Sequence, residues 1–229
     1  MKAPAGLDPP AGAATSAAMT APAIKICGLN TAQALDAAIA ARAEYGGFVF
    51  FPKSPRHVTL TDAAALGQRA QGRIARVGLF VDADDATIAE AVAAAHLDIL
   101  QLHGSETPER AVQLKAAFGL PVWKALPVAT AADVARASRY AGAADLILFD
   151  AKTPKGALPG GMGLAFDWSL VADYKGRAWG LAGGLGPDNV GVAVRLTGTP
   201  LVDCSSGVES APGVKDAEKI AAFCREVRR

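Results

Sequence analysis

The sequence predicts an α/β protein, a single closed (β/α)8 barrel, and three observations support this fold. Eight short apolar runs alternate with alanine-rich stretches along the chain. The runs begin 22 to 32 residues apart, which suits one strand, one helix and two short loops per unit. Their apolar residues are continuous rather than alternating, as in parallel strands that are buried on both faces.

The expected strands follow one another from residue 24 onward. They are Ile24–Leu29, Gly47–Phe51, Val77–Asp82, Ile99–His103, Val122–Leu126, Leu146–Asp150, Ala178–Gly183 and Leu201–Cys204. A doubly wound open sheet is the alternative, but the only early glycine-rich turn is not the Gly-x-Gly-x-x-Gly of a dinucleotide-binding fold. Eight repeated units therefore favour the closed barrel.

The stretches between the strands show the apolar spacing of helices. Ala111, Leu114 and Phe118 share one face of such a helix. Thr107 directly precedes Pro108, which is the usual order of an N-cap and a first-turn proline. The same spacing recurs after the other strands, so each strand is expected to be followed by a helix.

Residues 1–22 differ from the rest of the chain because they are rich in Ala, Pro and Gly and contain almost no large apolar side chains. Pro9 and Pro10 interrupt the apolar segment that a signal peptide would need. We expect a disordered N-terminal tail at 1–22 and one catalytic barrel domain at 23–229, without secretion.

Composition excludes several classes of partner. The chain has 23 basic and 22 acidic side chains, so we expect neither nucleic acid nor an anionic membrane as a partner. No apolar run is long enough to span a membrane. The odd set of Cys27, Cys204 and Cys224 does not make a disulfide framework and suits a reducing, cytoplasmic setting. Cys204 and Cys224 are interpreted as packing residues.

Polar residues follow the expected strands where a barrel carries its chemistry, at the carboxyl ends. Because these ends meet at one mouth, we expect the side chains to form a single site. The candidates are Cys27, Arg56, His103, Asp150, Gly183, Gly184, Asp203, Ser205, Ser206 and Gly207.

Glycine-rich turns after the seventh and eighth strands predict a phosphate site. Gly183 and Gly184 form one turn, and Ser205, Ser206 and Gly207 form the other. Either alone is more often a tight turn or a helix cap. Together, at the positions where many barrels bind phosphate through backbone amides, they predict a phosphorylated small-molecule substrate.

Cys27 and Asp150 are candidates for general base and general acid, because proton transfer on a sugar needs one group to accept and one to donate. A thiol can act as base if its pKa is lowered from about 8.5. The alternatives are an inert core cysteine and a capping aspartate. Arg56, in a loop stiffened by two prolines, either binds a carboxylate or is a solvated loop residue. His103 has no partner at metal-ligand spacing, so no metal is expected.

The ordered set of motifs resembles the phosphoribosylanthranilate isomerase family of tryptophan biosynthesis. The matching stretches are Lys25–Leu29, Gly47–Arg56, Val77–Asp82, Leu100–Gly104, Leu148–Asp150, Gly160–Gly163 with Phe166–Trp168, Leu181–Leu185, and Val202–Glu209 with Pro212–Asp216. One departure is Met162, where the family usually has threonine.

The resemblance implies a TIM barrel that catalyses an Amadori rearrangement of a phosphoribosylated anthranilate, with no cofactor. It implies Cys27 as base, Asp150 as acid, and Arg56 near the substrate carboxylate. His103 and Asp203 match positions that line the family's site, and the last two turns bind phosphate. A monomer or a homodimer is expected.

Three rival functions remain. The analogous histidine-pathway isomerase pairs two aspartates, so Cys27 argues against it. Indole-glycerol-phosphate synthase relies on lysine and glutamate, and Lys124 is the only lysine within the fifth strand. A barrel without activity, kept as a binding or scaffold protein, is the third possibility, and the presence of both proton-transfer candidates argues against it.

Overall fold

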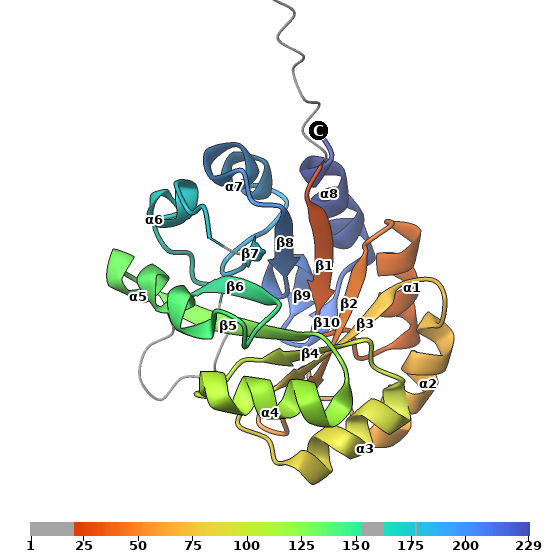
Figure 1. Ribbon diagram of the computed structural model, residues 1–229. Helices are drawn as coiled ribbons and strands as arrows, with labels where there is room; N and C mark the ends of the chain where they lie inside the picture. The colour runs from red at the N-terminus through yellow and green to blue at the C-terminus, as the bar shows by residue number, and fades with distance from the viewer. Residues whose placement is uncertain (1–20, 153–162, 177) are drawn as a thin grey trace, which may run out of the picture.

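Eight parallel strands close into one barrel in the computed structural model, which describes residues 21–152, 163–176 and 178–229 (Figure 1). The strands pair in chain order, and β8 returns to β1. They are β1 (Ala23–Cys27), β2 (Tyr45–Phe50), β3 (Ala75–Phe80), β4 (Ile99–Leu102), β5 (Val122–Val128), β6 (Leu146–Ala151), β7 (Trp179–Leu181) and β8 (Leu201–Cys204). The predicted barrel is confirmed, and every predicted strand overlaps an observed one.

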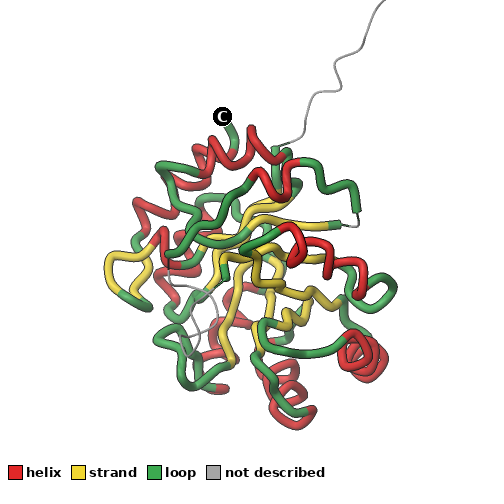
Figure 2. Tube along the Cα trace, turned by 90° about the vertical axis from the view of Figure 1, so that its left-hand side faces the viewer, coloured by secondary structure: helices red, strands yellow, loops and turns green. Residues whose placement is uncertain are grey.

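Helices surround the strands on the outside of the barrel (Figure 2). They are α1 (Ala32–Ala40), α2 (Leu60–Ala70), α3 (Asp85–Ala95), α4 (Pro108–Phe118), α5 (Ala131–Ala135), α6 (Ser169–Ala172), α7 (Val190–Thr197) and α8 (Ala217–Val227). A 3-10 helix at Arg136–Tyr140 continues α5. In the described part of the chain no helix is long and apolar enough to cross a membrane.

Helix α4 shows how local sequence sets these boundaries. The Thr107 side chain accepts a hydrogen bond from the Arg110 N–H and caps the helix, with Pro108 in the first turn. Gly119 ends the helix with φ of 65°, a left-handed conformation that glycine adopts without steric cost. The buried face carries Ala111 and Leu114, as the spacing predicts.

Strand alternation divides side chains between the helices and the barrel interior. On β1, Ile24 and Ile26 are fully buried in the outer core between strands and helices. Lys25 and Cys27, at the alternate positions, point to the interior. Deeper in the barrel a second apolar cluster fills the space with Val77, Ile99, Trp123, Ala125, Leu148 and Leu201. The polar side chains of the interior therefore lie in the layers nearer the carboxyl ends of the strands.

A short hairpin after β8 was not expected from the sequence. It consists of β9 (Glu209–Ala211) and β10 (Val214–Lys215). Gly213 turns the hairpin with φ of 82°, and a Cβ built there would lie 2.4 Å from the Pro55 carbonyl oxygen. The hairpin therefore packs against the loop after β2 and brings Glu209 to Arg56.

Two expectations fall outside the described residues. The predicted tail covers 1–22, of which 1–20 are not described, and Met162 belongs to the undescribed segment 153–162.

All three cysteines are free and buried, and Cys204 and Cys224 are each 1 % exposed, as their interpretation as packing residues requires.

Candidate active site

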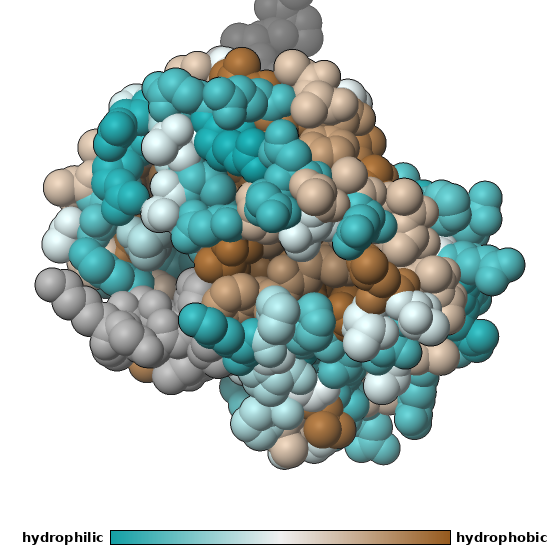
Figure 3. All heavy atoms as spheres, turned by 90° about the horizontal axis from the view of Figure 1, so that it is seen from below, coloured by the Kyte–Doolittle hydropathy of each residue, from teal (hydrophilic) through white to brown (hydrophobic). Residues whose placement is uncertain are grey.

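A pocket opens at the carboxyl ends of the strands, where the sequence places the site. Figure 3 views this end of the barrel and shows hydrophobic side chains around a central depression. Nine of the ten candidate residues line the pocket: Cys27, Arg56, His103, Asp150, Gly183, Gly184, Asp203, Ser205 and Ser206. Val49, Leu79 and Phe51 supply part of its apolar wall. The pocket thus combines a hydrophobic wall with converging polar groups.

Gly207 is the candidate that the structure places behind the pocket. A Cβ at this position would lie 2.0 Å from the Leu185 carbonyl oxygen. The turns after β7 and β8 are therefore in backbone contact, which only glycine permits there. The Cys204 thiol donates to the same Leu185 oxygen at 3.0 Å, which fixes the two turns together.

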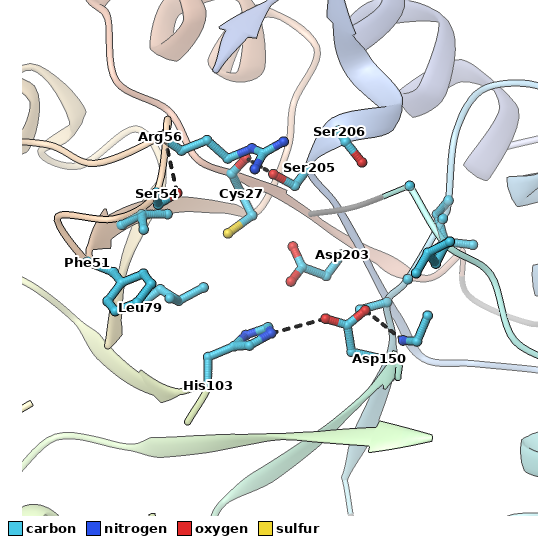
Figure 4. Close-up of a pocket in the computed structure, with 18 of the residues that line it drawn as sticks. Cys27, Phe51, Ser54, Arg56, Leu79, His103, Asp150, Asp203, Ser205 and Ser206 are labelled. Carbon is cyan, nitrogen blue, oxygen red and sulfur yellow. Dashed lines mark hydrogen bonds and ion pairs between the residues drawn. The ribbon is translucent and has the colours of Figure 1, made fainter. Parts of the chain in front are cut away.

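Cys27 ends β1 and directs its sulfur toward the middle of the site (Figure 4). Its side chain is nearly buried, at 5 % exposure. Burial raises the pKa of the thiol, and the nearby Lys25 opposes that rise without cancelling it. The thiol pKa is therefore not lowered here, as a ready base would need, because the desolvation of the thiolate outweighs the effect of the cation.

Asp150 ends β6 on the other side of the pocket. Its Oδ1 accepts a hydrogen bond from the Ala151 N–H at 2.8 Å, and its Oδ2 lies 3.1 Å from His103 Nε2. Gln101, two residues before His103 on the same strand face, places Nε2 at 3.0 Å from His103 Nδ1. The Gln101 amide therefore contacts one ring nitrogen of His103, while the other ring nitrogen faces Asp150.

The absence of a side chain at Gly183 leaves space for the Asp150 carboxylate. A Cβ at Gly183 would lie 2.9 Å from Asp150 Oδ1 and 2.4 Å from the Ala151 nitrogen. Its φ is 82° and that of Gly184 is 63°, so both positions favour glycine. The turn after β7 therefore comes close to the candidate acid while it leaves backbone amides at the pocket.

Arg56 lies in the loop after β2, at the edge of the pocket, and is 8 % exposed. Its Nε and Nη2 each donate to Glu209 at 2.8 Å, one to each carboxylate oxygen. The ion pair with Glu209 holds the plane of the guanidinium in place.

Lys215 and Ser205 connect the hairpin to the strand ends. Lys215 Nζ donates to Glu209 at 2.6 Å and to the Ser205 carbonyl oxygen at 3.0 Å. Burial raises the pKa of Glu209, but its bonds with Arg56 and Lys215 outweigh this and keep it below its ordinary value. The Ser205 hydroxyl donates to the Cys27 carbonyl oxygen at 3.1 Å. Ser205 therefore ties the eighth strand end to the first.

The sequence-based reasoning missed Lys25, Gln101 and Glu209. Lys25 and Gln101 are fully buried, and each lies two residues before a candidate residue on the same strand face. A polar residue inside an otherwise apolar strand was the signal that could have identified both. Glu209 had no such signal, because the hairpin that carries it was not expected.

The described ranges contain no group of three or more His, Cys, Asp or Glu side chains placed to hold a metal ion.

Asp82, which ends the third expected strand, lies outside the main pocket. Its Oδ1 accepts from the Ser105 N–H and hydroxyl at 2.8 and 2.9 Å, so it organises the loop after β4.

Comparison with known proteins places this chain in a family. A family model described as N-(5'-phosphoribosyl)anthranilate (PRA) isomerase matches residues 24–226. The N-(5'-phosphoribosyl)anthranilate isomerase of Paramagnetospirillum magneticum is 54% identical over 207 residues, covering 90% of this chain and 96% of that protein.

Solved structures agree. Monomers generated from the dimeric enzyme of Thermotoga maritima have a TM-score of 0.77 at 35% identity, covering 90% of this chain and 98% of that one. A phosphoribosyl anthranilate isomerase in complex with reduced 1-(o-carboxyphenylamino)-1-deoxyribulose 5-phosphate has a TM-score of 0.78 at 33% identity, with the same coverage. The chain belongs to the N-(5'-phosphoribosyl)anthranilate isomerase family.

Proposed function

We propose that the barrel mouth carries out the family's Amadori rearrangement with Cys27 as general base and Asp150 as general acid. The substrate is N-(5-phosphoribosyl)anthranilate and the product is 1-(2-carboxyphenylamino)-1-deoxyribulose 5-phosphate, a step of tryptophan biosynthesis. The observation that carries the proposal is that the two groups enter one pocket from β1 and β6 (Figure 4). A relative bound to a reduced form of this product supports the choice of substrate.

The reaction begins with two proton transfers and ends with a ketonisation. Asp150 donates a proton to the furanose ring oxygen, the bond from C1 to this oxygen breaks, and the nitrogen lone pair forms an iminium. The Cys27 thiolate then removes the proton from C2, and the electron pair neutralises the iminium to give an enolamine. Ketonisation adds a proton at C1 and releases one from the C2 hydroxyl. Because the iminium accepts the electrons, the steps need no cofactor.

The remaining candidates bind the substrate in this proposal. The amides of Gly183 and Gly184 and the groups of Ser205 and Ser206 hold the phosphate, since backbone N–H groups in such turns suit an anion, and Gly207 shapes the second turn from behind. Arg56 meets the anthranilate carboxylate. Asp203, between Cys27 and Asp150 in Figure 4, and His103 meet the sugar part.

The direct experiment follows the loss of phosphoribosylanthranilate fluorescence after the purified chain is added. We expect turnover in buffer treated with a chelator and without added cofactor. A chain that binds the reduced product analogue but does not consume substrate would be a binding protein, and the proposed function would be wrong.

Arg56→Lys tests carboxylate recognition. Lysine keeps the charge but loses the two-pronged geometry, so transition-state binding should weaken by about 1–3 kcal/mol. Product-analogue inhibitors with and without the carboxylate are compared in both enzymes. Lys53→Met, an exposed residue of the same loop, is the control and should change neither inhibition constant. Equal weakening of both inhibitors by Arg56→Lys would show that Arg56 does not contact the carboxylate.

Deletion of residues 1–22 tests the proposed domain boundary. We expect unchanged turnover and a change in unfolding free energy below about 1 kcal/mol, because the first strand begins at Ala23. Thermal unfolding and a turnover assay on the full and shortened chains measure this. A larger loss of stability would place the tail within the folded barrel.

Assembly and location are further proposals. We infer a cytoplasmic enzyme, active as a monomer or a homodimer. The support is the set of free, buried cysteines, and a relative whose solved form is described as monomers generated from a dimer. Light scattering on the purified chain distinguishes the two states.

A further inference from the structure

A charged pair lies in the barrel interior beside Cys27, and the proton transfers proposed above do not use its lysine. Lys25 Nζ is 2.9 Å from both carboxylate oxygens of Asp203. The two residues are direct register partners on β1 and β8. Lys25 is fully buried and Asp203 is 8 % exposed.

This pair is not explained by stability alone. The desolvation of two buried charges costs several kcal/mol, and apolar residues of similar volume often replace such a pair without loss. Burial lowers the pKa of Lys25, but the charge and the hydrogen bonds of Asp203 outweigh burial, so its pKa lies above the ordinary value. Lys25 is therefore an ammonium ion throughout the neutral range.

Geometry places this ammonium next to the candidate base. Lys25 and Cys27 project from the same face of β1, and Gly47 on β2 is the register partner of Cys27. A Cβ built at Gly47 would be 3.0 Å from the Cys27 sulfur and 3.2 Å from Lys25 Cε. The missing side chain of Gly47 thus leaves the space in which the sulfur and the end of the lysine lie together.

Other charged groups face the sulfur from the surrounding elements. Asp203 comes from β8 and Lys215 from β10, and both interact electrostatically with the thiol. Lys215 forms an ion pair with Glu209, which also binds Arg56. The His103–Asp150 pair lies across the pocket (Figure 4). Strands β2 and β3 contribute only apolar Val49 and Leu79 to the wall beside Cys27. After burial, Lys25 has the largest effect on the thiol.

We propose that Lys25 is a positioning residue for the general base: its ammonium, held by Asp203, stabilises the thiolate of Cys27. The proposal rests on the proposed role of Cys27. A buried thiol without a neighbouring cation would hold its proton too tightly to remove one from carbon. Lys25 keeps the thiolate accessible, and Asp203 keeps Lys25 charged and directed at the sulfur.

The test titrates Cys27 in the full chain by the ultraviolet absorbance of its thiolate. The Cys27→Ser signal is subtracted for each form, so that Cys204 and Cys224 cancel. Lys25→Met keeps the length of the side chain and removes the charge. We expect it to move the Cys27 midpoint to higher pH, with about tenfold less thiolate at a given pH. Lys25→Arg keeps the charge, so the Cys27 midpoint of this variant should lie close to that of the wild type. An unmoved midpoint in Lys25→Met would overturn the proposal.

Lys25→Met leaves Asp203 buried without its cation and can fail to fold. The second variant, Lys25→Met with Asp203→Asn, leaves no unpaired charge. Because Lys25 affects the thiol more strongly than Asp203 does, this variant should also raise the midpoint. A lowered or unchanged midpoint would again contradict the role of Lys25.

The pH dependence of kcat separates this proposal from the proposed function. If both hold, the limb of the profile that depends on Cys27 moves with the thiol midpoint, while KM changes little. If the thiol midpoint moves but the rate profile does not, Cys27 is not the general base. Its interaction with Lys25 would still be supported.

Discussion

Replacing Cys27 by serine should lower kcat by about 100- to 10,000-fold and leave KM largely unchanged. Serine keeps the shape of the side chain, but the pKa of its hydroxyl is far too high for it to accept a proton from carbon. The measurement is steady-state turnover at saturating substrate, together with single-turnover rates that show whether chemistry limits kcat.

Cys204→Ser is the matched control. Cys204 is also buried at a strand end, but its thiol donates to the Leu185 oxygen, and a serine hydroxyl can do the same. This variant should keep kcat. If Cys27→Ser also keeps near-normal turnover while product release is fast, the Cys27 thiol is core filling, and Asp203 is the next candidate base.

The pH dependence of wild-type kcat follows from the environment of Cys27. A base acts when deprotonated, so the active fraction grows as pH rises toward the pKa of the thiol. Because burial raises that pKa, the limb of the pH profile that belongs to Cys27 should lie above about pH 8.5, the ordinary thiol value, and Cys27→Ser should remove it. At neutral pH the reaction draws on a minority thiolate form.

Asp150→Asn should produce a loss of similar size, about 100- to 10,000-fold in kcat. The amide oxygen can still accept from the Ala151 N–H, but the residue has no proton to give the furanose ring oxygen. The measurement is again kcat and KM with phosphoribosylanthranilate. A reduced rate with unchanged affinity is the signature of a group that acts only in the chemical step.

Asp82→Asn is the matched control for Asp150. Asp82 ends the third strand run, and its side chain accepts hydrogen bonds from Ser105, a contact that an amide oxygen can replace. It should keep kcat. The double variant Cys27→Ser with Asp150→Asn should be little slower than the slower single variant, because both groups serve one pathway. Fully additive losses would indicate that the two side chains act independently.

Much of the site follows from the sequence because a parallel barrel has simple geometry. Strand side chains alternate with a period of two, and all carboxyl ends meet at one mouth. The residues that close each apolar run, such as Cys27, His103 and Asp150, therefore had to come together. Turn chemistry likewise predicted Gly183 and Gly184, since both have the positive φ that glycine favours.

The sequence by itself determined the barrel, the order of its strands and the side chains that face its mouth, because these depend on local periodicity and turn residues. Only the tertiary structure decided which charges meet. Arg56 is bound by Glu209, 153 residues away, and Lys25 by Asp203, 178 residues away. The direction of the pKa shift of Cys27 was decided in the same way, because desolvation and ion pairing depend on distances through space between residues that are remote in the chain.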